Sequence, residues 1–394
     1  MNLITRATNI LLAACGLAGC SSHPEIHISV KNSIDLAREN EIIEIPMRAL
    51  TPLSLQPSEQ LVVINQNNQQ VAYQLTYDSL LIFPVSVAAN GESHYTICTG
   101  NPEKTPVITC GKQYPERLDD LAWENDKAAY RAYGSALEEK GERSFGYDIF
   151  TKSVAEPVVE ERYRMHLDSK NPLSYHVDHG NGMDVYSVGA TLGGGTAALM
   201  PDSAILYPYA YRKHEILDNG PLRFTVRLTY APFAIGKDIA VTETRLISLD
   251  QGSHLNRTEV NYQGLSEATP IAAGIVIHPQ NPDGYSFDRE SRYMAYADST
   301  DCTTCGNGVI YVGTVFTSDP ENITLQWFAE EEKKKHSGAL GHLLGGGIYH
   351  PGNCYTYYWG SGWSKAGISN MEAWETYLKN YDRRLKAPLQ ITFN

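Results

Sequence analysis

The 394-residue sequence lacks an excess of basic side chains. Its 32 lysines and arginines stand against 45 aspartates and glutamates, so the formal net charge is −13 at pH 7. Nucleic acid binding needs a basic face that contacts phosphates, and this composition therefore argues against nucleic acid as the main partner. A small anionic ligand such as an acidic sugar is still allowed, because a few local arginines suffice to hold it. The sequence also shows no internal repeat.

Cysteine is scarce as well, with seven in the whole chain. Cys98 and Cys110 stand at the ends of two strand-like segments and could close a short loop by a disulfide. Cys302 and Cys305 predict a small loop clip, because no βαβ pattern of the kind that carries a redox CxxC surrounds them. A structural zinc is not favoured, since neither a second CxxC nor a paired histidine completes a ligand set.

The first 20 residues predict a bacterial lipoprotein signal peptide. Residues 9–19 are short and apolar and lead into LAGC, which ends at Cys20, the expected site of lipidation. Cys15 would leave a very short apolar region. Ser21 stands where an aspartate favours inner-membrane retention, so we expect an outer-membrane lipoprotein on the periplasmic or cell-surface side. Its lipid would anchor it without a spanning segment. The alternative is an ordinary cleaved signal with a chance cysteine.

The rest of the chain predicts an all-β protein with few helices. Residues 21–100 contain short segments rich in branched and aromatic residues, which predict a small N-terminal β-sandwich region. Residues 101–118 look like a linker, and 119–394 would form the main domain. Within it, 222–230 alternates apolar and polar residues without a break, as a half-buried antiparallel strand does. Further strands are expected at 241–249, 255–262, 271–278, 309–316, 324–328, 354–359 and 389–393. This spacing indicates a large antiparallel β-sandwich.

One helix is predicted near the C-terminus. Ser369 and Glu372 form a capping box, and an apolar stripe follows them at helical spacing: Met371, Trp374, Leu378 and Tyr381. Residues 330–335 mix acidic and basic side chains and are expected to form a solvated loop. Residues 119–141 fit a helix by composition and a strand by alternation.

Residues 174–199, SYHVDHGNGMDVYSVGATLGGGTAAL, combine two histidines, two aspartates, two tyrosines and six glycines. Glycine permits positive φ and close backbone approach. The stretch is too polar for a central strand, so we expect a long shaped loop of the kind that carries functional sites.

His176 and His179 in this stretch allow three interpretations. A neutral imidazole can move a proton near working pH. Alternatively, both histidines bind a metal ion with Asp178, Asp184 or His278 as a further ligand. This is less favoured because the pattern is not a helical HExxH. In the third interpretation both histidines brace the loop by hydrogen bonds to the backbone.

Tyrosines and arginines near these histidines predict a second part of the site. Tyr147, Tyr175 and Tyr186 flank the histidines in sequence, and Arg143 precedes the first of them. A guanidinium can neutralise a uronic acid carboxylate and make the C5 proton acidic, while other side chains take that proton and protonate the group leaving C4. The plainer interpretation is that the tyrosines line sheets and that the arginines form surface ion pairs.

Further substrate-binding candidates come from the same segments and from one later strand. They are Trp123, Asn125, Arg131, Asp178, Asp184, Tyr186 and His278. For Trp123 and Asn125 the alternative is a buried corner with a capping amide.

Several motifs in order resemble the domain of unknown function 4861 family: WENDKAAYRAYGSAL, FGYDIFTKS, the stretch 174–199, ILDNGPLRFTVRLTY, LISLDQGSHLNRTEV and GIVIHP. The resemblance covers about 41–381. It implies a galactose-mutarotase-like β-super-sandwich, and a strand for AAYRAYG. It also implies a role in Bacteroidetes polysaccharide-utilisation loci and, for the family, an oligosaccharide dehydratase that leaves a 4,5-unsaturated uronic acid.

We therefore expect a cofactor-free enzyme of acidic polysaccharide degradation that performs β-elimination at a uronic acid, as dehydratase or lyase. His176 or His179 would be the base, a tyrosine or the other histidine the acid, and Arg143 the carboxylate partner. One alternative is a glycoside hydrolase with paired carboxylates, for which the candidates are Glu124, Asp148, Asp178 and Asp184. The other is a non-catalytic glycan-binding lipoprotein.

Overall fold

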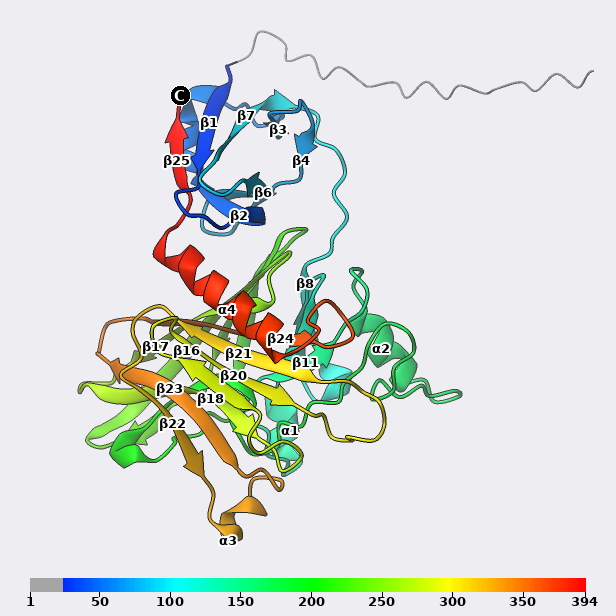
Figure 1. Ribbon diagram of the computed structural model, residues 1–394, viewed down its shortest axis with the longest axis vertical. Coiled ribbons are helices and arrows are strands. Elements are labelled where there is room, and N and C mark those ends of the chain that lie inside the picture. Colours follow the sequence, from blue (N-terminus) through cyan, green and yellow to red (C-terminus); the bar gives the residue numbers. More distant parts are fainter. Residues whose placement is uncertain (1–23) are drawn as a thin grey trace, which may run out of the picture.

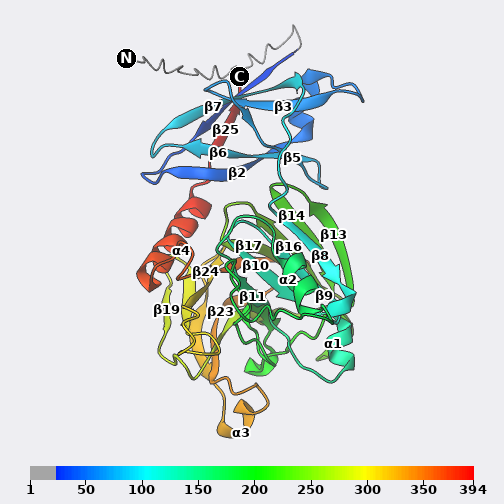
Figure 2. The same cartoon turned by 90° about the vertical axis from the view of Figure 1, so that its right-hand side faces the viewer.

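The computed structural model describes residues 24–394, which fold into two β domains stacked along the long axis of the molecule (Figures 1 and 2). The predicted signal peptide over 1–20, with Cys15 and Cys20, lies outside the described residues. The prediction of an all-β protein with few helices is confirmed. No helix within 24–394 is long and apolar enough to cross a bilayer.

The N-terminal domain is a sandwich of two antiparallel sheets. Apolar side chains that alternate along the strands, such as Ile28, Val30 and Phe83, meet between the sheets and are almost fully buried. The short helix η1 (Met47–Leu53) closes one end. The first sheet has the order β25 (Gln390–Phe393), β1 (Ile26–Lys31), β7 (Glu92–Gly100), β3 (Gln60–Asn65) and β4 (Gln70–Val71). The second has the order β2 (Arg38–Pro46), β6 (Leu80–Val87) and β5 (Gln74–Leu75).

The last strand of the chain belongs to this first domain. β25 pairs with β1 in antiparallel register, with Ile28 opposite Phe393 and Val30 opposite Ile391. The strand expected at 389–393 is therefore present. It belongs to the N-terminal domain, so the expectation that the main domain runs to 394 is wrong for this last strand. The helix α4 (Met371–Lys386) carries the chain back from the main domain to the N-terminal sheet (Figure 1).

The main domain is built from three antiparallel sheets. The nine-stranded sheet runs in the order β13 (Lys213–Asn219), β14 (Arg223–Thr229), β16 (Asp238–Asp250), β17 (Leu255–Gln263), β24 (Tyr355–Trp363), β21 (Ile310–Phe316), β20 (Tyr293–Asp298) and β19 (Tyr285–Asp288), with β15 (Phe233–Ile235) beside β16. The second sheet has the order β12 (Gly194–Leu199), β18 (Thr269–Ile277), β23 (Gly341–Tyr349) and β22 (Asn322–Trp327). The third has the order β11 (Asp148–Thr151), β10 (Ala128–Ala132), β9 (Asp120–Glu124) and β8 (Cys110–Tyr114).

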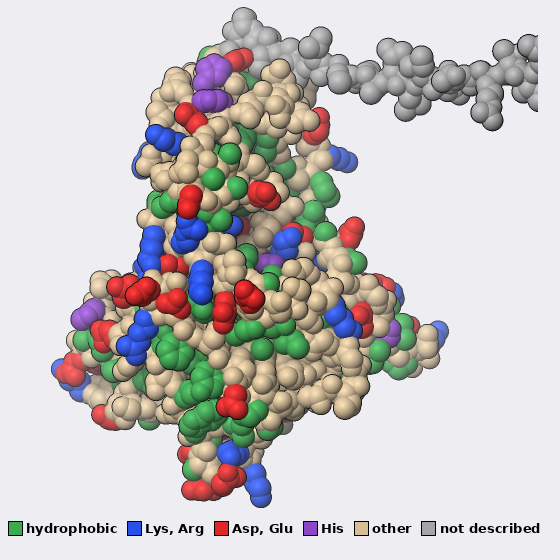
Figure 3. Space-filling model, viewed as in Figure 1, with side chains coloured by type: hydrophobic (Ala, Val, Ile, Leu, Met, Phe, Trp, Pro, Cys, Tyr) green, Lys and Arg blue, Asp and Glu red, His purple; other side chains and the backbone are tan. Residues whose placement is uncertain are grey.

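One large apolar core joins these three sheets, because each contributes buried residues to it, for example Trp123, Ile275 and Trp359. The amphipathic helix α4 covers the far side of the nine-stranded sheet through Trp374 and Leu378. The remaining short helices lie at the margins: η2 (Pro115–Arg117), α1 (Ser135–Glu139), α2 (Val159–His166), η3 (Pro201–Ser203) and α3 (Glu330–Lys333). Charged side chains of both signs gather where the two domains meet (Figure 3).

The glycine-rich stretch 174–199 is a loop only in its first part. Its end forms β12, a wholly buried strand at the edge of the second sheet that pairs with β18, so the expectation of a loop throughout is wrong. Glycine makes this possible: at Gly195, with φ of 118°, a Cβ atom would lie 2.8 Å from the Cβ of Trp359. The triple glycine thus serves close strand packing.

Other local expectations are also corrected. The segment 101–118 is not only a linker, since it contains β8. α4 is capped by Asn370, whose side chain accepts from the backbone N–H of Ala373 at 2.8 Å, in place of the predicted Ser369 box. Residues 330–335 contain α3, although its side chains stay solvated.

One of the two disulfide predictions is confirmed. Cys302 and Cys305 form the expected disulfide. Cys110 keeps its thiol, so the suggested Cys98–Cys110 bridge is wrong.

Candidate active site

The third sheet separates the apolar core from a polar layer. Along its strands one set of side chains, including Trp123 and Tyr130, enters the core, because alternate residues of a strand point to opposite faces. The other set includes Asp120, Arg131 and Asp148, which lie on the outer face. α2 and the loop 174–186 cover that face, and a small aromatic cluster containing Tyr163 and Tyr175 lies beneath them.

Arg131 lies at the centre of this layer and bonds three carboxylates. Its Nε donates to Asp148 at 2.8 Å, its Nη1 to Asp120 at 3.2 Å and its Nη2 to Asp184 at 3.2 Å. Tyr133 donates to Asp148 at 3.0 Å. All four charged side chains are buried. We call Asp120, Arg131, Tyr133, Asp148 and Asp184 the Arg131 network.

The network holds more carboxylates than cations. Burial raises the pKa of Asp184 well above its usual range, and the adjacent Asp148 raises it further against the opposing effect of Arg131. Burial likewise raises the pKa of Asp120, with Arg131 acting against it. Asp184 is therefore the member that carries a proton most readily, because carboxylates this close cannot all ionise in a dry site.

Both loop histidines bond the backbone, as the bracing interpretation expects. His176 Nδ1 donates to the carbonyl of Asp184 at 2.8 Å, and His179 Nε2 donates to that of Ser174 at 3.0 Å. His176 nevertheless keeps Nε2 as a proton acceptor, and its side chain is 52% exposed. For the metal interpretation, no group of three or more suitable side chains within residues 24–394 could hold an ion.

His176 belongs to a cluster that also contains Arg117, His166 and Tyr175. Arg117 donates to the Tyr175 hydroxyl, and its guanidinium carbon lies 5.2 Å from the centre of that ring. The rings of His166 and His176 each lie 4.4 Å from the Tyr175 ring, measured between centroids. Burial lowers the pKa of His166, and the positive charges of Arg117 and His176 lower it further. We call these four residues the Arg117 cluster.

Arg117 forms no ion pair with a carboxylate in the described part of the chain, and its guanidinium bonds the Tyr175 hydroxyl instead. Its Nε and the Nδ1 of His166 are buried and have no hydrogen-bond partner in residues 24–394. The Arg117 guanidinium, which has no carboxylate partner there, is suited to bind an anionic substrate group.

A further histidine, His278, lies beyond the Arg131 network. His278 follows β18 directly, and its Nδ1 is 2.6 Å from Oδ2 of Asp298 at the end of β20. The Tyr186 ring stands nearly perpendicular to the His278 ring at 6.0 Å between centroids. Tyr186 is 5% exposed, and its hydroxyl has no hydrogen-bond partner within residues 24–394.

Three predicted site residues lie in the core instead. Trp123 donates to Asn256 at 2.7 Å. Tyr147 stacks on Trp359 at 4.0 Å and accepts from Arg245 at 3.0 Å. Asn125 donates to two carbonyls of a neighbouring turn, which is the buried capping amide given as its alternative. None of the three can reach a substrate, because all are at most 2% exposed.

The other predicted residues either form hydrogen bonds outside the candidate site or lie away from it. Asp178 accepts from the N–H groups of Gly180 and Gly182 and shapes the loop. Glu124 accepts from Lys152 at 2.7 Å and from the start of α2. Arg143 is exposed and has no ion pair within the described chain, and it does not join the Arg117 cluster.

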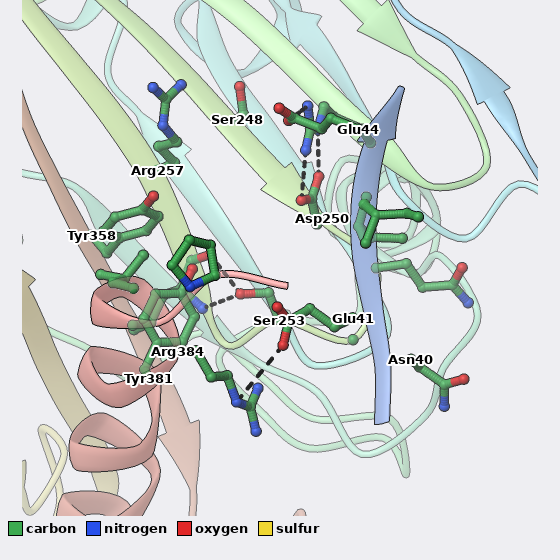
Figure 4. Close-up of a pocket in the computed structure, with 18 of the residues that line it drawn as sticks. Asn40, Glu41, Glu44, Ser248, Asp250, Ser253, Arg257, Tyr358, Tyr381 and Arg384 are labelled. Atoms are coloured by element: carbon green, nitrogen blue, oxygen red, sulfur yellow. Dashed lines mark hydrogen bonds and ion pairs between the residues drawn. The ribbon is translucent and has the colours of Figure 1, made fainter. Parts of the chain in front are cut away.

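A cavity of about 770 Å³ lies elsewhere, between the two domains (Figure 4). Arg223 spans it, donating to Glu44 at 2.6 Å and to Asp250 at 2.5 Å. Seven carboxylate side chains and three arginines line it, and no histidine does. Its charge does not suit an acidic sugar, so we place the candidate site at the Arg117 cluster and the Arg131 network.

The fold and this site define an all-β protein of two domains with a buried, charged centre beneath a histidine-bearing loop. The chain belongs to the family described as Domain of unknown function (DUF4861), whose model matches residues 30–391. A relative from Formosa agariphila, described as Uncharacterized protein P7, is 26% identical over 403 residues, and the alignment covers 97% of each chain.

Two solved structures from Enterococcus faecalis show a weak similarity to this chain. One is a protein in glycosyl hydrolase family 38, with a TM-score of 0.47 and 8% identity over 94% of this chain and 47% of that one. The other is an alpha-mannosidase, with a TM-score of 0.43 and 10% identity over 94% and 46%. The chain therefore spans about half the length of these structures.

The sequence analysis missed Asp120, Arg117, Tyr133, His166 and Asp298. Asp120 and Asp148 stand directly before apolar runs and Asp298 directly after one, and Tyr133 follows Arg131 at the spacing of one strand face. Those positions were a usable signal. Arg117 and His166 carried none, because the linker-like segment and α2 that supply them meet only in the folded chain.

Proposed function

We propose that this protein catalyses β-elimination at a uronic acid unit of an acidic oligosaccharide, as a dehydratase or lyase. The observation that supports this is the Arg117 cluster, in which a guanidinium holds the Tyr175 hydroxyl beside two imidazoles. These are the side chains that abstraction of a proton next to a carboxylate requires.

In this mechanism Arg117, and not Arg143, neutralises the substrate carboxylate, which makes the C5 proton acidic. His176 Nε2 takes that proton, while the bond from Nδ1 to the Asp184 carbonyl fixes the ring. Burial raises the pKa of Tyr175, against the effects of Arg131 and Arg117, so its phenol stays protonated. Because its oxygen accepts from Arg117, its own hydrogen is free to donate to the substrate.

The proposal is tested by incubating the protein with oligosaccharides that end in a uronic acid and following the ultraviolet absorbance of the new double bond. We expect absorbance to rise with the wild type. The rate of that rise should be at least about 100-fold lower with His176→Gln or Arg117→Gln. Arg164→Gln, on the exposed side of α2, is the matched control and should keep full activity. Substrate binding without any reaction would instead indicate a glycan-binding protein.

Hydrolysis is the second candidate. Asp148 and Asp184 lie together on Arg131, and the raised pKa of Asp184 resembles the acid of a glycosidase pair. The names of the two solved structures agree with this candidate. Both carboxylates are buried, however, and both are bonded to Arg131. Release of reducing ends without ultraviolet absorbance, lost in Asp184→Asn, would favour hydrolysis over elimination.

We also propose that the protein is a lipoprotein anchored through Cys20. Lipidation would place the enzyme where exported glycans are degraded. Metabolic labelling with a fatty acid should mark the wild type and not Cys20→Ala, and a labelled Cys20→Ala chain would contradict the proposal.

A further inference from the structure

The pair His278 and Asp298 has the geometry of an oriented acid–base group. His278 follows β18 directly and Asp298 ends β20, and these strands belong to two different sheets of the main domain, whose buried residues join one core. Asp298 is 1% exposed. Its Oδ1 accepts from the N–H of Thr300 at 2.8 Å, and its Oδ2 accepts from the Nδ1 of His278. A buried carboxylate on one ring nitrogen fixes the tautomer and the orientation of the imidazole.

The other ring nitrogen of His278 is left for chemistry. Nε2 has no hydrogen-bond partner in residues 24–394, and the side chain keeps 11% exposure. The backbone N–H of His278 is also held, because it donates to the Tyr296 hydroxyl at 3.1 Å. The ring therefore cannot turn away easily, and Nε2 points to one fixed region.

Tyr186 leaves a polar group unsatisfied in the same region. A buried hydroxyl without a partner costs about 1–3 kcal/mol, so such groups call for an explanation. Burial raises the pKa of Tyr186 well above its usual range, and Asp298 raises it further, so the group remains a neutral phenol. A substrate oxygen beside His278 would supply the missing partner.

Both imidazoles are tied to the same short segment of chain. His176 bonds the carbonyl of Asp184, and His278 packs against Tyr186, two residues further on. The two imidazoles are thus joined through the segment 184–186, which also carries Asp184 of the Arg131 network.

We infer that His278, held by Asp298, is the general acid of this site and protonates the oxygen that leaves C4, with the Tyr186 hydroxyl bonded to that same oxygen. This inference rests on the proposed elimination. His176 Nε2 takes the C5 proton, the C–H electrons form the C4–C5 double bond, and the C4–O bond breaks. The leaving oxygen takes the proton from His278 Nε2 and departs as water or as the hydroxyl of the next sugar.

The test compares two leaving groups. A uronide with its natural oxygen at C4 needs the proton, whereas a 4-deoxy-4-fluoro uronide releases fluoride without one. We expect His278→Gln to lose at least about 100-fold in kcat on the oxygen substrate and less than about 10-fold on the fluoride. His176→Gln should lose both activities alike, and His94→Gln in the N-terminal domain should lose neither.

Two more variants separate chemistry from structure. Asp298→Asn should show the same leaving-group dependence to a smaller degree. Tyr186→Phe removes a hydroxyl that makes no internal bond, so it should keep the melting temperature or raise it while slowing the oxygen substrate. Equal losses on both substrates, or no loss, in a folded His278→Gln protein would overturn the assignment. If the wild-type protein forms no double bond from either substrate, the proposed β-elimination itself is contradicted.

Discussion

Arg131 Nη2 lies 3.2 Å from Asp184 Oδ2, and yet Asp184 is the carboxyl of the network whose pKa burial raises most clearly. The unfolded pKa of an aspartate is about 3.9. Because the folded value is higher, the stability that neutral Asp184 contributes is complete below about pH 4 and is lost as the pH rises through the folded pKa.

Asp184→Asn should therefore gain stability relative to the wild type as the pH rises. The asparagine stays neutral and can still accept from Arg131. Urea unfolding at pH 4, 6 and 8 should show a difference that grows in favour of the variant. Asp178→Asn is the control of opposite sign: burial acts to raise the pKa of Asp178, but the N–H groups of Gly182 and Gly180 outweigh it and lower the pKa. That variant should be the less stable one at neutral pH and approach the wild type in acid.

Arg131→Met should unfold more easily, by about 3–5 kcal/mol, because it leaves three buried carboxylates without their cation. The loss should shrink in acid, where these groups take up protons. Denaturant titration measures both effects. Arg164→Met, which removes an exposed cation from α2, should leave the unfolding midpoint unchanged. An Arg131→Met protein as stable as the wild type would show that Arg131 does not stabilise ionised carboxylates in the network.

Acid should destabilise the protein through its buried histidines. Burial lowers the pKa of His342 to about 3, with His336 and His278 adding to the effect, and burial lowers that of His254 to about 4. Their contribution to stability is complete above about pH 6.5 and is lost as the pH falls through these values. Each histidine can add up to about 1.4 kcal/mol per pH unit to the slope of the free energy of unfolding against pH.

His342→Gln should reduce that slope, since glutamine can accept the N–H of Leu192 as His342 Nε2 does at 3.1 Å without binding a proton. The free energy of unfolding at pH 7 and pH 4.5 gives the slope for each protein. His94→Gln should leave it as in the wild type. An unchanged slope in His342→Gln would mean that this ring is accessible to protons in the folded state.

Removing residues 388–394 should loosen the N-terminal domain alone. β1 would lose its outer partner, which exposes the backbone edge beside Ile28 and Val30. Hydrogen exchange should speed up in β1 and β7 and stay slow in β20, which serves as the internal control. Equal protection of β1 in the shortened chain would show that the pairing adds nothing to the sheet.

Much of the β architecture could be predicted because strand alternation is a local pattern. The segment 222–230 reads as a half-buried strand in sequence and forms β14 in the structure. β12 and β23 were missed because their glycines lack the branched side chains that mark strands. Those glycines are explained only by neighbours distant in the chain, as Trp359 explains Gly195.

The site was predicted in part for the same reason. Residue type selects Tyr175, His176, Asp184, Tyr186, Arg131 and His278, and the structure shows contacts between Arg131 and Asp184, between Tyr175 and His176 and between Tyr186 and His278. Tyr147 was also chosen by type, but it alternates with Asp148 along the chain and so enters the core. Which of two neighbours faces the core depends on the strand register, and residue type alone did not supply it.

The pairing of β25 with β1 also sets an order of events during synthesis. β25 follows the whole main domain in the chain, so the first domain cannot complete its sheet until the main domain has been synthesised. A chain that stops early leaves that edge open, and an open edge invites pairing with other chains. A chain that stops before β25 therefore lacks the strand that completes the first sheet, even when the other strands of that sheet are present.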